Sequence, residues 1–216
     1  IYHENRARYE SKLVENTPTF KKSFDKHSFT LLAGQTYQDI DYGQIWGTKR
    51  NVLQNSATEE YYTVLDQGNE PQTGGYLQDA MLLSYLARFE YDYVDKYLLN
   101  GVLRRDGSSR FGNNNKWGNF PSISAAWRIS EESFFEFPAV DDLKVRASYG
   151  TLGNSNIGYW DYLGTINTFS TIAIGADQHI EAGATQVQLV NEDIPWETLK
   201  QMNFGLDAGF LNNRLT

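Results

Sequence analysis

Side chains able to do covalent or metal chemistry are few and widely spaced in this sequence. Its three histidines, His3, His27 and His179, lie far apart and lack the spacing of a zinc site. There is no cysteine, which excludes thiol catalysis, disulfide scaffolds and cysteine zinc sites. No phosphate-binding Gly-x-x-x-x-Gly-Lys motif occurs, and Ser155 lacks the following glycine that a nucleophile elbow requires. We therefore predict that the chain is not an enzyme.

The adjacent carboxylates do not change this prediction. Glu131-Glu132 and Asp141-Asp142 lie in expected turns, where solvated charges are more common than an acid/base pair. The segment 66–79 carries scattered oxygen ligands that could hold calcium, but it lacks the ligand spacing of an EF-hand. We expect no cofactor and no metal, and a calcium ion bound by this loop is the alternative.

Two further groups of residues could bind a substrate instead of reacting with it. The segment 104–111, Arg-Arg-Asp-Gly-Ser-Ser-Arg-Phe, is predicted to be a turn held by Asp106 with Arg104 or Arg110, and substrate contact is the second possibility. Aromatic residues of the expected loops could stack on sugar rings, fit peptide side chains, or pack the loops against each other. These loop aromatics are Trp46, Tyr61, Tyr159 and Trp160.

Composition narrows the class of protein that carries these residues. The 216 residues have a net charge of −8, which argues against a nucleic-acid partner because such a partner needs a basic face. Aromatic residues make up 14%, which fits the two girdles of an outer-membrane barrel and also fits a secreted carbohydrate-binding β-domain. No run of 18 apolar residues predicts a transmembrane helix, but barrel strands escape such a test. Because the chain begins with Ile1 and without a signal peptide, we expect an internal piece of a longer protein.

Period-2 alternation is the strongest structural signal. Within 85–93, aromatic and apolar residues alternate with polar and charged ones, and the same pattern occurs at 27–38, 97–105, 121–130, 143–149 and 203–210. These stretches run for roughly 9 to 13 residues, against about 5 to 6 for ordinary strands. A strand of about 10 residues, tilted near 40°, spans the roughly 25 Å apolar band of an outer membrane.

The connections complete the fold prediction. Turns near 25, 95, 136 and 212 are short, long loops are expected at 39–80, 106–119 and 152–197, and residues 1–18 are expected to be a loop. We predict an all-β fold, an antiparallel up-and-down transmembrane β-barrel segment of about seven strands from a larger barrel. Its open edges must then pair with further strands.

Charge predicts which face meets lipid. Arg or Lys on the lipid side of a barrel costs about 2 to 4 kcal/mol at the bilayer midplane, so charged side chains should line the lumen. The predicted lumen-lining residues are Arg88, Glu90, Arg104, Arg128, Lys144 and Arg146, and the predicted lipid-facing aromatics are Tyr91, Trp127 and Tyr149. A soluble β-sandwich is the alternative, because alternation alone does not say which side is water.

Several blocks of the sequence together resemble one family. They are Arg104-Arg105-Asp106-Gly107-Ser108-Ser109-Arg110-Phe111-Gly112, Lys116-Trp117-Gly118, Phe120-Pro121-Ser122, Trp127-Arg128-Ile129-Ser130-Glu131-Glu132, Leu143-Lys144-Val145-Arg146-Ala147-Ser148-Tyr149-Gly150 and Gly205-Leu206-Asp207-Ala208-Gly209-Phe210-Leu211. From about residue 25 to its end, the sequence resembles the SusC/RagA family of TonB-dependent outer-membrane transporters of Bacteroidota.

The resemblance implies that residues 1–216 are part of one barrel domain of about 22 strands in the outer membrane of a Gram-negative bacterium, with a plug outside this sequence. It implies nutrient uptake, the import of large oligosaccharides or oligopeptides. The implied partners are a SusD-like surface lipoprotein as a lid, the TonB complex acting through the plug region, and the lipid bilayer. Two alternatives stay open: a soluble or surface β-rich carbohydrate-binding or adhesin domain, and a siderophore-type TonB-dependent receptor.

Overall fold

Antiparallel strands make up most of the chain. The computed structural model describes residues 1–66, 68–177, 179–212 and 214–215. The elements are β1 (Tyr2–Asn16), β2 (Thr19–Phe24), β3 (His27–Arg50), β4 (Asn69–Tyr93), β5 (Tyr97–Ser108), β6 (Trp117–Arg128), the 3₁₀ turn η1 (Ile129–Glu131), β7 (Asp142–Asn154), β8 (Thr165–Ile174), β9 (His179–Gln188) and β10 (Glu197–Gly209). In the described residues, no helix has the length and apolar character needed to cross a membrane.

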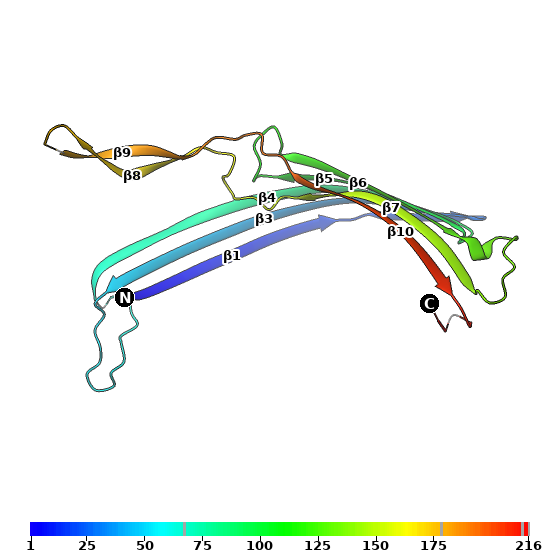
Figure 1. Cartoon of the computed structure of the whole chain (residues 1–216), viewed down its shortest axis with the longest axis horizontal. Coiled ribbons are helices and arrows are strands. Elements are labelled where there is room, and N and C mark those ends of the chain that lie inside the picture. Colours follow the sequence, from blue (N-terminus) through cyan, green and yellow to red (C-terminus); the bar gives the residue numbers. More distant parts are fainter. Residues whose placement is uncertain (67, 178, 213, 216) are drawn as a thin grey trace. The chain divides into compact units, whose positions relative to one another are not determined.

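The strands follow an up-and-down order. The main sheet runs β1-β3-β4-β5-β6-β7-β10, with β2 paired to β3, and β8 and β9 form a separate two-stranded sheet (Figure 1). The pairs β2–β3, β4–β5, β5–β6, β6–β7 and β7–β10 are antiparallel. The predicted all-β antiparallel fold is confirmed.

The chain divides into two compact units. Unit 1 comprises Ile1–Leu13 and Gln38–Met81, and unit 2 comprises Val14–Tyr37 and Leu82–Thr216. The residues predicted to line a lumen all lie in unit 2, which also carries the resemblance blocks. Each unit is therefore described by itself.

Unit 1 contains more strand than the sequence predicted. The predicted loop at 1–18 is wrong because β1 covers most of it, and the predicted loop at 39–80 shrinks to residues 51–68. In β1 up to Leu13 the charged side chains lie two residues apart and therefore share one face. The other face mixes polar residues such as Asn5 and Ser11 with Tyr9 and Leu13, so the hydropathy alternation is weak. On the charged side of β1, Arg6 Nε lies 2.9 Å from Glu4 Oε1, and Arg8 and Lys12 both pair with Glu10.

Glycines of unit 1 misled the prediction for a physical reason. Gly74 and Gly75 were expected to mark a turn, but both lie within β4. A Cβ atom at Gly74 would come within 2.5 Å of the Trp46 ring, so the glycine allows the indole to lie against the strand. Glycine therefore marks a close approach between strands here.

Connections of unit 2 follow the predicted positions more closely than the predicted lengths. Tight turns lie at 25–26 and 94–96, with Asp25, Val94 and Asp95 in the left-handed region. The loop expected at 106–119 is reduced to residues 109–116, because the Ser108 N–H donates to the Lys116 carbonyl at 3.0 Å and closes the hairpin. This connection is shorter than the connection 129–141, for which a short turn near 136 was predicted, so the predicted lengths of both connections are wrong. The excursion after β7 contains the β8–β9 hairpin.

The best-buried aromatic side chains of unit 2 form a cluster at one end of β6. Phe111 is fully buried and Phe120 nearly so. The Trp196 ring stacks on Phe111 at 4.6 Å between ring centroids and meets Phe120 edge-on at 5.4 Å. The Trp196 indole N–H also donates to the Asn115 carbonyl at 2.9 Å. This aromatic cluster ties the 109–116 connection to the segment that precedes β10.

Candidate functional site

Strand register in unit 2 produces one polar row and one apolar row. Directly opposite residues of antiparallel strands share a face. Across β4, β5, β6, β7 and β10, the polar row is Glu90, Asn100, Ser124, Ser148 and Asn203. One position along each strand, the apolar row is Tyr91, Leu99, Ala125, Ala147 and Phe204. The two faces of this sheet are thus chemically opposite.

The same separation of charged and apolar side chains extends along these strands. We call the two sides the charged face and the apolar face. In β5, β6, β7, β10 and the part of β4 from Leu82 on, the charged face carries Arg88, Glu90, Asp92, Arg104, Asp106, Arg128, Asp142, Lys144, Arg146, Glu197 and Asp207. Within the same strand residues, the apolar face carries two charged side chains, Arg105 and Lys200.

Ion pairs on the charged face join neighbours of opposite sign. Along single strands, Arg88 pairs with Glu90, and Arg104 Nε lies 2.7 Å from Asp106 Oδ1. At the β6–β7 end, Arg128 Nε lies 3.4 Å from Asp142 Oδ1. These pairs leave the face charged but without a dominant sign.

Asp207 forms ion pairs with two cationic side chains of the neighbouring strand β7. Lys144 Nζ lies 3.0 Å from Asp207 Oδ2, and Arg146 Nε lies 3.4 Å from Asp207 Oδ1. Gly205 stands directly opposite Arg146, and a Cβ there would come within 2.6 Å of Arg146 Nε. The glycine therefore gives the guanidinium room to lie across β10 and reach Asp207.

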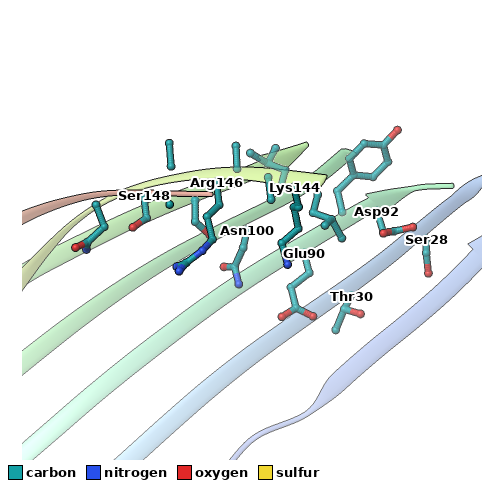
Figure 2. A pocket seen from close by; sticks show the side chains of 17 residues that line it. Ser28, Thr30, Glu90, Asp92, Asn100, Lys144, Arg146 and Ser148 are labelled. Carbon is teal, nitrogen blue, oxygen red and sulfur yellow. The ribbon is translucent and has the colours of Figure 1, made fainter. Parts of the chain in front are cut away.

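Two depressions lie along the charged face. The first has a volume of about 660 Å³, and its lining includes Glu90, Asn100, Lys144, Arg146 and Ser148 (Figure 2). The second has a volume of about 500 Å³, and its lining includes Arg104, Ser122 and Gln201. Hydroxyls, amides and charges of both signs can exchange hydrogen bonds with a hydrated, polar molecule. The two depressions therefore offer hydrogen-bond donors, acceptors and charges of both signs to such a molecule.

The strand registers show which face each predicted site residue occupies, while the assignment of one face to a lumen and the other to lipid stays a prediction. All six residues predicted to line a lumen share the charged face, and Tyr91, Trp127 and Tyr149 share the apolar face. The sequence analysis missed Asp207 as a partner of Lys144 and Arg146. The alternation at 203–210 places Asp207 on the polar side, which was the available signal.

The aromatic residues predicted to lie in loops belong to both units, and one of them lies in a strand. Trp46 is not in a loop: it lies in β3, where its ring approaches His3 at 6.2 Å. Tyr61 lies in the connection 51–68 of unit 1 and forms an isolated bridge with Gln54. Tyr159 and the exposed Trp160 lie in unit 2 after β7.

The segment 104–111 is divided between two roles. Arg104 pairs with Asp106, but both lie within β5, so the turn predicted there is wrong and the chain turns only after Ser108. Arg110 instead places its guanidinium 4.3 Å from the centroid of the Tyr159 ring and donates from Nη1 to the Ile157 carbonyl at 3.1 Å. Arg110 therefore holds the connection after β7 through a cation–π contact and a hydrogen bond.

Glu132 departs from the solvated turn charge that was expected. Its Oε1 accepts hydrogen bonds from the Tyr97 hydroxyl at 2.6 Å and the Trp127 indole N–H at 3.1 Å. Lys96 Nζ lies 3.5 Å from Oε2, and the Glu132 side chain is 14% exposed. The Tyr97 hydrogen bond and then the Trp127 hydrogen bond lower the pKa of Glu132 below its ordinary value. Glu132 therefore holds the side chains of Tyr97 and Trp127 in place.

Metal ligands do not cluster in the part of the chain that the structure describes. No group of three or more His, Asp or Glu side chains there could hold a metal ion. In the segment suggested for calcium, Asp79 lies on β4, and Gln67 is outside the described residues.

Comparisons with known proteins agree with this architecture. Residues 2–216 match the family described as TonB dependent receptor-like, beta-barrel. The chain is 35% identical over 206 residues to TonB-dependent receptor P3 of Formosa agariphila, covering 94% of this chain and 20% of that protein. It is 32% identical over 205 residues to TonB-dependent receptor SusC of Bacteroides thetaiotaomicron, covering 90% of this chain and 19% of that protein.

A solved structure extends the likeness to three dimensions. The structure of the RagAB peptide transporter matches 98% of this chain and 23% of that chain, with a TM-score of 0.77 and 29% sequence identity. The chain spans about a fifth of the length of the curated relatives it matches. The similarity to SusC and RagAB confirms the resemblance found in the sequence. With two chemically opposite faces on one antiparallel sheet, this chain belongs to the TonB-dependent receptor-like β-barrel family.

Proposed function

We propose that the charged face lines the lumen of an outer-membrane import barrel and that the apolar face contacts lipid. The segregation of charge on the sheet carries this proposal. Each Arg or Lys placed in lipid at midplane costs about 2 to 4 kcal/mol, so the opposite orientation would be expensive for Arg88, Lys144 and Arg146 together. The apolar side chains Ile123, Phe204 and Leu206 are exposed, as lipid contact requires.

The aromatic residues of β6 match the height of a bilayer. Trp117 and Trp127 lie at the two ends of this strand and both belong to the apolar face. About ten residues at about 3.3 Å each, tilted by about 40°, rise about 25 Å along the membrane normal. That height equals the apolar band between two aromatic girdles, so both tryptophans would lie at the water interfaces.

We further propose that the cargo is a large hydrophilic oligomer, an oligosaccharide or an oligopeptide. The uncharged amides and hydroxyls of Asn100, Ser124 and Ser148 and the paired charges of the same face suit a hydrated substrate without a strong net charge. The similarity to SusC and to the RagAB peptide transporter supports the same class. A SusD-like surface lipoprotein as a lid and the TonB complex as the energy source are the proposed partners, as the resemblance implies.

Adjacent residues of β6 provide a matched test of orientation. Ala125 belongs to the apolar face and Ser124 to the charged face. In the full-length protein, Ala125→Arg should destabilise the folded barrel by about 2 to 4 kcal/mol, and Ser124→Arg by much less. Unfolding in lipid vesicles and the amount of folded protein in the outer-membrane fraction measure both. Equal effects of the two substitutions would contradict the orientation.

Uptake assays test the cargo. Cells that express the full-length protein, and cells that lack it, are given labelled oligopeptides, oligosaccharides or a ferric siderophore. We expect protein-dependent uptake of an oligopeptide or oligosaccharide class. Dependence on the siderophore alone would favour the siderophore-receptor alternative. Recovery of the protein in the soluble fraction without detergent would favour the adhesin alternative and overturn the transport proposal.

A further inference from the structure

Arg105 is an exception on the apolar face of unit 2. It lies near the 109–116 end of β5, between Tyr85 of β4 and Asn119 of β6. The next apolar-face residue along β5 is Leu103. The apolar face of β5, β6, β7, β10 and the part of β4 from Leu82 on carries two charged side chains, Arg105 and Lys200. Lys200 lies on β10, so on this part of β4 and on β5 and β6 the charged side chain of this face is Arg105.

Aromatic rings hold the Arg105 guanidinium in place. Its Cζ atom lies 5.0 Å from the centroid of the Trp117 ring, within cation–π distance. The Trp117 ring in turn stacks with Tyr85 at 6.1 Å and an interplanar angle of 24°. Among the residues that the structure describes, no carboxylate lies within ion-pair distance of Arg105. The guanidinium therefore keeps donors that can bind an anion.

An apolar groove begins beside this cation on the same face. Its volume is about 720 Å³, and its lining includes Leu31, Ala87, Phe89, Gly101, Leu103 and Ile123. The floor is open at Gly101, where a Cβ atom would meet nothing within 4 Å. Leu103 and Ala87 lie two residues from Arg105 and Tyr85 along their strands, so the groove and the cation adjoin.

We propose that Arg105 and this groove together bind one phosphorylated lipid of the surrounding membrane. The phosphate accepts hydrogen bonds from Arg105 beside the Trp117 ring, and one acyl chain lies in the groove over Gly101. An anionic headgroup with an attached apolar chain matches both halves of the site, since a free anion would leave the groove empty and a neutral lipid would leave the cation unpaired. The inference rests on the proposed orientation, in which the apolar face meets lipid.

The test uses full-length protein extracted from the outer-membrane fraction in non-ionic detergent. Native mass spectrometry measures how much bisphosphorylated lipid A the protein retains, and how much of the same lipid A it retains after enzymatic dephosphorylation. Each measurement is repeated with added inorganic phosphate. Arg105→Gln removes the charge, and Gly101→Leu fills the groove. Lys200→Gln is the matched control, because Lys200 also lies on the apolar face but on β10, which contributes no residue to the lining of the groove.

We expect the wild-type protein to bind bisphosphorylated lipid A on the order of tenfold more tightly than the dephosphorylated form. Arg105→Gln should abolish this preference, and Gly101→Leu should weaken the binding of both lipids. Lys200→Gln should leave both unchanged, and millimolar inorganic phosphate should not displace the lipid.

Three outcomes would overturn the inference: equal binding of both lipids by the wild-type protein, an equal loss in Lys200→Gln, or displacement by inorganic phosphate, which would indicate an anion site without an acyl chain. Failure of the transport proposal is distinguishable. It would appear earlier, as absence of the protein from the outer-membrane fraction or absence of uptake, before any lipid is added.

Discussion

Phe111 stabilises a cluster of connections, so truncating it should loosen the 109–116 segment locally. The side chain is fully buried and stacks on Trp196 at 4.6 Å. A buried phenylalanine removes about 150 to 250 Å² from water, and at about 25 cal/mol per Å² this corresponds to about 4 to 6 kcal/mol as an upper bound. Measured Phe→Ala substitutions in cores cost about 3 to 5 kcal/mol. We expect Phe111→Ala to lower the free energy of local opening by about 3 kcal/mol or more.

Hydrogen exchange followed by mass spectrometry measures this opening in the full-length protein. The amides of Ser108 and Asn115 donate to the carbonyls of Lys116 and Gly112, so both report on the cluster. A loss of about 3 kcal/mol should accelerate their exchange by about 100-fold. Amides of β7 within the sheet should keep their wild-type rates, because the change is local.

Phe134→Ala is the matched control for this substitution. Phe134 is 65% exposed, so removal of its ring should change the free energy of opening by less than about 0.5 kcal/mol. The explanation would be refuted if Phe111→Ala accelerated exchange of the two amides by less than about tenfold. It would also be refuted if exchange in β7 increased equally, because the aromatic cluster would then not be a local unit.

Three other substitutions test single contacts. Trp196→Phe keeps a ring on Phe111 but loses the hydrogen bond to the Asn115 carbonyl, which should cost about 1 kcal/mol in the same exchange assay. Asp207→Asn should change the unfolding midpoint little, because the charges around Asp207 are partly exposed, and a large shift would contradict this. The lowered pKa of Glu132 gives a stabilisation that is complete above its ordinary value of 4.5 and is lost as the pH falls through the lower folded-state pKa. Unfolding measured against pH should therefore show a smaller acid-dependent loss of stability in Glu132→Gln than in the wild-type protein.

Much of unit 2 was predictable because its signal is local. Residues two positions apart on a strand share a face whatever the rest of the chain does, so Tyr91, Trp127 and Tyr149 could be separated from Arg88 and Arg146 by alternation alone. The two-residue turn after Phe24 and the turn near Asp95 were also visible as local chemistry. The resemblance blocks lie in the same strands and turns.

Unit 1 was harder because the same local signal is weak there. Hydropathy alternates only weakly in this unit. Most of β1, residues 39–50 of β3 and residues 69–80 of β4 were therefore predicted to be loops. The glycines within them suggested turns, although Gly74 leaves space for Trp46, which is distant in sequence. Such a contact can be identified only when the strands are paired.

The sequence by itself determined which side chains share a face and which family the strands resemble, because both depend on neighbours along the chain. The tertiary structure alone decided the partners across strands. It brought Asp207 to Lys144 and Arg146, stacked Trp196 on Phe111, and placed Arg105 beside Trp117 at the end of an apolar groove. These contacts depend on strand register and on the path of the connections, and hydropathy patterns specify neither.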